Sequence, residues 1–176
     1  PGDDPEGQRP NSRDALGIGT DLNQDEIGNI VVDHCSISWG LDSNIDLFNR
    51  GGRTYNLTVQ NCIIAESLSD SIHVDEGKTQ PAPHGTAMLV NRDHENISIH
   101  HNLFAHNVGR VPTLNETLNP ATLIEIANNV FYDWGNFGNQ KWGLFCIRLA
   151  AHTNFDIVNN YFKKGPAGSG EGHVPI

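Results

Sequence analysis

A ten-residue unit recurs five times along the chain, and this repetition constrains the fold more than any other feature. Each copy alternates apolar and polar residues over its first half. Equivalent positions are spaced 27, 40, 27 and 31 residues apart, an interval range typical of solenoids and propellers. The copies are NIVVDHCSIS at 29–38, NLTVQNCIIA at 56–65, NISIHHNLFA at 96–105, LIEIANNVFY at 123–132 and NFDIVNNYFK at 154–163.

Stacking the five copies produces two columns of similar side chains. An aliphatic column should face a common core. A second column, three residues later, holds cysteine and then asparagine, which tolerates left-handed backbone angles at a turn and can bond to the equivalent amide one coil away. We expect both cysteines to be small buried members of that column. The columns are Val32, Val59, Ile99, Ile126 and Ile157, and Cys35, Cys62, Asn102, Asn129 and Asn160.

The residue types of the unit predict an all-β fold, a parallel β-helix. Val, Ile and Phe are frequent, the apolar period is 2, and no stripe with a 3.6-residue period is present. A constant unit with variable spacing indicates constant strands joined by loops of changing length. Function is expected on the longest insertion, residues 66–95, because long loops on a regular scaffold usually carry it.

Length and charge narrow the alternatives further. The 176 residues predict a single domain over 1–176, with an irregular N-terminal segment at 1–13 and a flexible tail at 164–176. The chain begins with Pro1, and we expect a fragment of a longer protein that lacks N-terminal coils and caps. Its net charge of -10 argues against nucleic acid as a partner, and no apolar run reaches the roughly 20 residues of a membrane helix. Three cysteines are too few for a disulfide framework.

Three acidic residues are candidate metal ligands. Asp42 and Asp46 follow the first repeat unit, and Asp14 precedes it. If the chain bends between the first two, their carboxylates can converge on one hard cation, and a third from the neighbouring coil would help to close an oxygen-lined Ca²⁺ site. The alternative interpretation is a solvated acidic rim.

Two arginines are candidates for binding an acidic ligand. Arg110 lies on the loop that leaves the third unit, and Arg148 should lie about one coil further along. A guanidinium group matches a carboxylate bidentately, although a lone surface arginine is often only a solubilising charge. By contrast, His100 and His101 are consecutive, so their side chains should diverge, and stacked turn residues are favoured over a metal pair.

The order of these motifs resembles the pectate lyases of polysaccharide lyase family 1. The similarity covers roughly residues 14–162 and rests on DALGI, VVDHCSISW, the Asp42 and Asp46 pair, and ISIHHNLFAHNVGRVP. It implies a right-handed parallel β-helix. It also implies that Asp14, Asp42 and Asp46 bind calcium and that Arg110 is the catalytic base.

The resemblance further implies a secreted or periplasmic enzyme, expected to be monomeric, that acts on polygalacturonate. Such an enzyme cleaves its acidic polymer by β-elimination to 4,5-unsaturated products, with Ca²⁺ as cofactor. Arg148 would contact the substrate. Because guanidinium is normally protonated up to a pH above about 12, a nearby cation must favour the neutral base, which predicts activity weighted to alkaline pH.

The sequence departs from the family pattern at a substrate-binding lysine. The family residue aligns with Thr86, and Lys78 or His84 are the candidate replacements in substrate binding. A further arginine often found five residues after the base would be Asn115. Both departures would weaken binding of the polymer or change its geometry.

Two other functions remain open at this point. One is a β-helical carbohydrate-binding or adhesive module without turnover, which the missing lysine favours. The other is a metal-independent pectin lyase, against which the three aspartates argue. Hydrolysis of the polygalacturonase kind is disfavoured because its paired-aspartate motif with a Gly-His-Gly partner is not visible.

Overall fold

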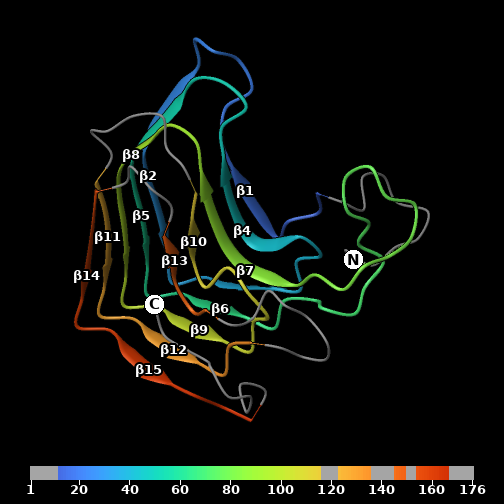
Figure 1. Ribbon diagram of the computed structural model, residues 1–176. Coiled ribbons are helices and arrows are strands. Elements are labelled where there is room, and N and C mark those ends of the chain that lie inside the picture. The colour runs from blue at the N-terminus through green and yellow to red at the C-terminus, as the bar shows by residue number, and fades with distance from the viewer. Residues whose placement is uncertain (1–11, 116–122, 136–144, 150–153, 167–176) are drawn as a thin grey trace.

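The computed structural model describes residues 12–115, 123–135, 145–149 and 154–166. Within these ranges the regular structure is entirely β-strand, wound into three sheets (Figure 1). The strands are β1 Leu16–Ile18, β2 Glu26–Asp33, β3 Ser36–Ser38, β4 Ser43–Phe48, β5 Arg53–Gln60, β6 Ile63–Ala65, β7 Thr86–Asn91, β8 His94–His100, β9 Leu103–Ala105, β10 Thr113–Leu114, β11 Leu123–Ala127, β12 Val130–Tyr132, β13 Arg148–Leu149, β14 Asn154–Val158 and β15 Tyr161–Lys163.

Each turn of the chain contributes one strand to each sheet. Sheet 1 has the order β1-β4-β7-β10-β13, sheet 2 the order β14-β11-β8-β5-β2, and sheet 3 the order β15-β12-β9-β6-β3. Neighbouring strands are therefore three apart in sequence, and they pair in parallel. This arrangement is a parallel β-helix, which confirms the predicted fold class.

Every repeat unit becomes a strand of sheet 2, a two-residue corner and a short strand of sheet 3. The left-handed residue is the first of the two corner residues, so the expectation of left-handed angles in the column itself is wrong. The unit at 56–65, for example, forms β5 and β6 on either side of Asn61, whose φ is 52°. Left-handed backbone of this kind favours asparagine. The strand register places the aliphatic column as predicted: Val32 pairs with Val59, and then Ile99, Ile126 and Ile157 follow in line.

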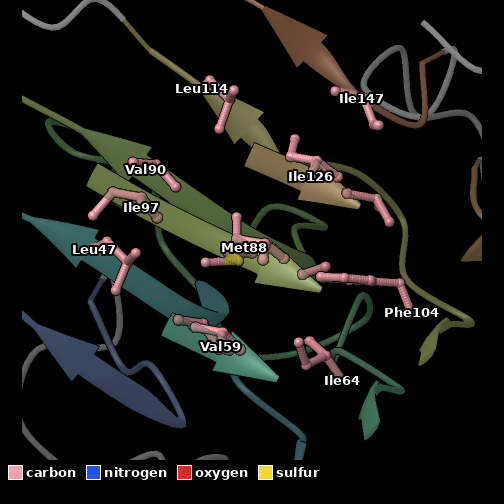
Figure 2. Packing of buried hydrophobic residues seen from close by; sticks show 14 of the residues in the cluster. Leu47, Val59, Ile64, Met88, Val90, Ile97, Phe104, Leu114, Ile126 and Ile147 are labelled. Atoms are coloured by element: carbon pink, nitrogen blue, oxygen red, sulfur yellow. The ribbon is translucent and has the colours of Figure 1, made fainter. Parts of the chain in front are cut away.

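The core fills the space enclosed by the three sheets. Figure 2 shows side chains from all three sheets pointing toward one another, among them Leu47, Val59, Ile64 and Met88. Three aromatic rings stack through successive coils of sheet 3: Phe104 on Phe131 and Phe131 on Phe162, each with ring centroids 5.0 Å apart. Inward side chains at equivalent positions of successive coils thus pack on side chains of the same type.

The asparagine column forms a buried ladder of hydrogen bonds at the corner between sheets 2 and 3. The backbone N–H of Asn102 donates to Asn129 Oδ1 at 2.9 Å, and the N–H of Asn129 donates to Asn160 Oδ1 at 2.9 Å. Each amide also returns a bond to the previous coil, as when Asn129 Nδ2 donates to the Ile99 carbonyl at 2.8 Å. The ladder provides hydrogen-bond partners for polar groups that would otherwise be buried at this corner without any.

The expectation that both cysteines are buried is wrong for one of them. Cys62 is 2% exposed and accepts a contact from the Cys35 N–H at 3.5 Å. Cys35 itself is exposed. It belongs to the coil of β2 and β3, which form the edges of sheets 2 and 3, so no described strand stacks on its outer side.

The predicted irregular segments fall mostly outside the described residues. Of 1–13, only Ser12 and Arg13 are described, and neither lies in a strand; of 164–176, only 164–166 are described, also without a strand. Within the described ranges, there is no helix with the length and apolar character needed to span a membrane.

Candidate functional site

A register row along the outer face of sheet 1 contains two of the candidate residues, Asp46 and Arg148. Gly17 pairs with Asp46, Asp46 with Leu89, Leu89 with Thr113, and Thr113 with Arg148. Neighbouring residues on the same strands, such as Ile45 and Met88, are buried in the core. Alternation along each strand therefore turns the row outward.

Two adjoining clefts lie over this face. A cleft of about 320 Å³ is lined by residues that include Thr113, Phe145 and Arg148. A second cleft of about 730 Å³ is lined by residues that include Asp42 and Asp46. Three residues line both clefts and so mark where they join: Asp75, His84 and Arg110.

The three aspartates come together from two neighbouring coils, as predicted. Asp42 immediately precedes β4, Asp46 lies within β4, and Asp14 lies two residues before β1, the strand that pairs with β4. The backbone N–H of Ser43 donates to Asp14 Oδ1 at 2.9 Å. This bond ties the carboxylate of the first coil to the loop that carries Asp42.

Charge repulsion is strong within this group. Burial, together with the charges of Asp46 and Asp42, raises the pKa of Asp14 from 3.8 to about 7. Burial and the Asp42 charge likewise raise the pKa of Asp46 to about 6. Asp46 Oδ1 is buried and has no hydrogen-bond partner among the described residues. An orphaned carboxylate oxygen beside two other acids is a donor set that fits a hard divalent cation.

Asp42 differs from its two neighbours because cationic and imidazole groups surround it. Burial acts to raise its pKa, but the close approach of the His84 imidazole and the charge of Arg110 outweigh burial and hold the pKa below its usual range. His84 Nε2 lies 2.8 Å from Asp42 Oδ1, and Arg110 Nη1 donates to the same oxygen at 3.2 Å. Asp42 is thus an ionised carboxylate.

Arg110 lies on the connection between β9 and β10, as predicted. Its φ of 49° is left-handed, and its carbonyl accepts the Met88 N–H at 2.7 Å, which fixes the backbone against β7. Its Nη1 also donates to Ser43 Oγ at 3.3 Å. With 31% of its side chain exposed, the guanidinium is held by the protein yet open to the clefts.

The remaining predicted substrate contacts have different positions. Arg148 is exposed on β13 and lines the smaller cleft, one coil from Thr113, in agreement with its expected place. His84 lines both clefts, whereas Lys78 is exposed and is not among the residues that line either one. Asn115 lines the smaller cleft.

Thr86 has a structural part in the site. It is 5% exposed, its Oγ1 donates to the Asp42 carbonyl at 2.6 Å, and it shares a hydrogen bond with Ser43 Oγ at 2.8 Å. The position that the family pattern gives to lysine therefore holds the Asp42 loop against β7 in this chain.

Sequence reasoning missed two residues of the site, His73 and Asp75. Both lie in the 66–95 insertion, which folds back so that the His73 ring stacks on the His84 ring with centroids 4.0 Å apart. Burial, followed by the neighbouring His84, lowers the pKa of His73. Two histidines and an aspartate in an insertion already expected to carry function were the available signal.

Fold and site together define a class: a parallel β-helix whose outer face carries clefts lined by carboxylates and arginines. The chain is 32% identical over 157 residues to a probable pectate lyase C of Aspergillus fumigatus, a match that covers 89% of the chain and 30% of the relative. A probable pectate lyase C of Aspergillus flavus is 30% identical over 154 residues, covering 88% and 29%. One of Aspergillus terreus is 29% identical over 140 residues, covering 80% and 27%.

The names of these relatives agree with the family that the motif order resembles. No protein-family model matches the chain. The chain spans about 30% of the length of the curated relatives that it matches. On the strength of its fold and these relatives, the chain belongs to the pectate lyase family.

Proposed function

We propose that this chain is the catalytic region of a calcium-dependent pectate lyase that cleaves polygalacturonate by β-elimination. The observation that carries the proposal is that Asp42 and Asp46 line the larger cleft on the outer face of sheet 1 together with Arg110, which also lines the smaller cleft. Relatives named as pectate lyases supply the substrate class.

Asp14, Asp42 and Asp46 are the residues that would hold Ca²⁺. Besides burial, the charges of Asp46 and Asp42 raise the pKa of Asp14, and the charge of Asp42 raises that of Asp46. Asp46 Oδ1 also has no described partner, so a cation would relieve a repulsion that the folded chain otherwise carries. When bound between these acids and a uronate carboxylate, Ca²⁺ would make the C5 proton of that sugar more acidic.

Arg110 is the proposed base. It would accept the C5 proton, the C5–H electron pair would become the C4–C5 double bond, and the C4 glycosidic oxygen would leave. The present salt bridge to Asp42 favours the charged guanidinium. Release of that bridge, when the Asp42 carboxylate turns to a cation, is therefore a requirement for Arg110 to act as base.

Arg148 and His84 are the proposed substrate contacts within the clefts. Arg148 follows the register row that begins near Asp46, so it would meet a carboxylate at some distance along the polymer from the reacting sugar. Lys78 remains a prediction, since the lining of the clefts gives it no support.

We further propose that the partner is an acidic polysaccharide outside the cell, bound by a monomer. An acidic chain binding an acidic polymer needs cations between them, which the arginines and Ca²⁺ would supply. Neither nucleic acid nor membrane is expected as a partner.

The test is an absorbance assay for the 4,5-unsaturated product from polygalacturonate, with added Ca²⁺ and with a chelator. We expect product only with Ca²⁺. Equal activity on methylated pectin in chelator would instead indicate a metal-independent pectin lyase. Polymer binding without any product would indicate a carbohydrate-binding module and would refute the lyase proposal.

A further inference from the structure

A cluster of two imidazoles and one carboxylate lies beside the acidic site. Asp42, His73 and His84 each offer a ligand atom, and these atoms all lie within 4.8 Å of one another. Nitrogen ligands of this kind suit divalent transition metals, whereas Ca²⁺ takes oxygen ligands. The cluster is thus chemically different from the three aspartates.

Each of the two imidazoles has a buried ring nitrogen without a hydrogen-bond partner among the described residues. His73 is 3% exposed, and its Nδ1 is buried without a hydrogen-bond partner among the described residues. His84 Nε2 is likewise buried and lies 2.8 Å from Asp42 Oδ1 without the alignment of a hydrogen bond. Buried polar atoms are rarely left in this condition.

Asp75 lies beside the opposite nitrogens of both rings. Its Oδ1 is 3.3 Å from His73 Nε2 and 3.8 Å from His84 Nδ1. A carboxylate that receives the second N–H of a metal-binding histidine fixes the ring and its tautomer. Here Asp75 is within reach of His73 Nε2 and lies farther from His84 Nδ1. The nitrogens left for a metal are His73 Nδ1 and His84 Nε2.

We propose that Asp42, His73 and His84 form a binding site for a divalent transition metal such as Zn²⁺, with Asp75 as the outer carboxylate. The larger cleft is lined by all four residues and leaves space for water or a sugar oxygen as a further ligand. The site goes beyond the proposed function and shares Asp42 and His84 with it. A metal here would compete with Arg110 for Asp42 Oδ1.

The test is titration of the chelator-treated full chain with Co²⁺, followed through the visible absorption of the bound ion and then by displacement with Zn²⁺. We expect one Co²⁺ per chain. His73→Gln and His84→Gln should each weaken binding by at least about 100-fold, and Asp75→Asn by about 10-fold to 100-fold.

The double variant His100→Gln/His101→Gln is the matched control. These two rings also meet, with Nδ1 atoms 2.9 Å apart, so the expectation that the side chains diverge is wrong. His101 is exposed and His100 half-buried, and they lie at the corner and the end of sheet 2, away from the clefts. Co²⁺ binding should be unchanged in the control. The inference is overturned if the wild type does not bind Co²⁺, if both glutamine variants bind it normally, or if the control loses it.

A further variant, with a new spectroscopic signal, tests the metal site even if a glutamine variant fails to fold. His84→Cys should add a sulfur-to-cobalt charge-transfer band, and a folded variant without that band would contradict ligation by residue 84. The titration contains no polymer, so it is independent of lyase activity. A chain that binds Co²⁺ yet makes no unsaturated product refutes only the proposed function, and the reverse result refutes only the metal site.

Discussion

The asparagine ladder runs through the third, fourth and fifth coils, the three aspartates lie on the first two, and the two regions treat polar groups in opposite ways. In the ladder, the Asn129 amide bonds to both neighbouring coils and its polar atoms are satisfied. On the acidic face, Asp46 Oδ1 has no described partner and the carboxylates repel one another. The difference separates a polar group that maintains the fold from one that is held ready for a ligand.

Replacing Arg110 should have the largest effect and should fall on activity alone. Arg110→Lys keeps a positive charge beside Asp42 but moves the proton-accepting atom, so kcat should fall by about 10²-fold to 10⁴-fold while Tm is unchanged. Arg53→Lys is the control, because Arg53 pairs with Glu26 and Glu95 on the exposed side of sheet 2. A normal rate for Arg110→Lys would refute its assignment as base.

Breaking the ladder should reverse this pattern. Asn129→Ala removes the acceptor of the Asn102 N–H and leaves the Ile99 carbonyl unpaired, so unfolding free energy should fall by about 2–4 kcal/mol. Asn128→Ala, at the exposed residue next to Asn129 in the same corner, should lower the unfolding free energy by less. Denaturant unfolding measures both variants, and equal losses would show that the buried bonds add nothing.

Asp42→Asn should have a smaller effect, which is measured through the calcium requirement. One charged ligand becomes neutral, so the Ca²⁺ concentration for half-maximal activity should rise about tenfold. Asp156→Asn, on the exposed strand β14, is the control. An unchanged calcium titration in Asp42→Asn would remove this residue from the metal site.

The smallest effect concerns pH. The pKa values of Asp14 and Asp46 are raised to about 7 and about 6 from 3.8, so the folded chain holds protons that the unfolded chain releases. The stability that these two groups contribute to the chelator-treated protein is therefore fully present below about pH 4 and is lost as pH rises to about 7.

Thermal unfolding across this pH range measures the loss. Asp46→Asn should flatten the profile, because it removes one titrating group and lessens the repulsion on Asp14. Stability that rises with pH in the same interval would contradict the proposed repulsion.

Sequence alone predicted the repetitive part of the fold and much less of the site. Columns such as Val59, Ile99 and Ile126 follow from a period of 2 and a fixed unit, which local residue types determine. Sheet 1 gave no comparable signal. Its strands β10 and β13 have two residues each, too short for a pattern.

The site residues divide in the same way. Asp14, Asp42, Asp46 and Arg110 were found by motif order, and their convergence required only that neighbouring coils stack. His73 could not be predicted to meet His84, since that contact depends on how the 66–95 insertion folds back. Likewise, nothing in the sequence indicated that Thr86 would be held by Ser43 and the Asp42 backbone.

The register row across sheet 1 places side chains at regular intervals along the clefts. Parallel strands lie about 4.8 Å apart, so Asp46, Leu89, Thr113 and Arg148 are evenly spaced marks at right angles to the strands. A polymer lying over the row meets one side chain per coil. Replacing the residue at one position of the row would change binding at a single point along the polymer and leave the contacts of the neighbouring coils unchanged.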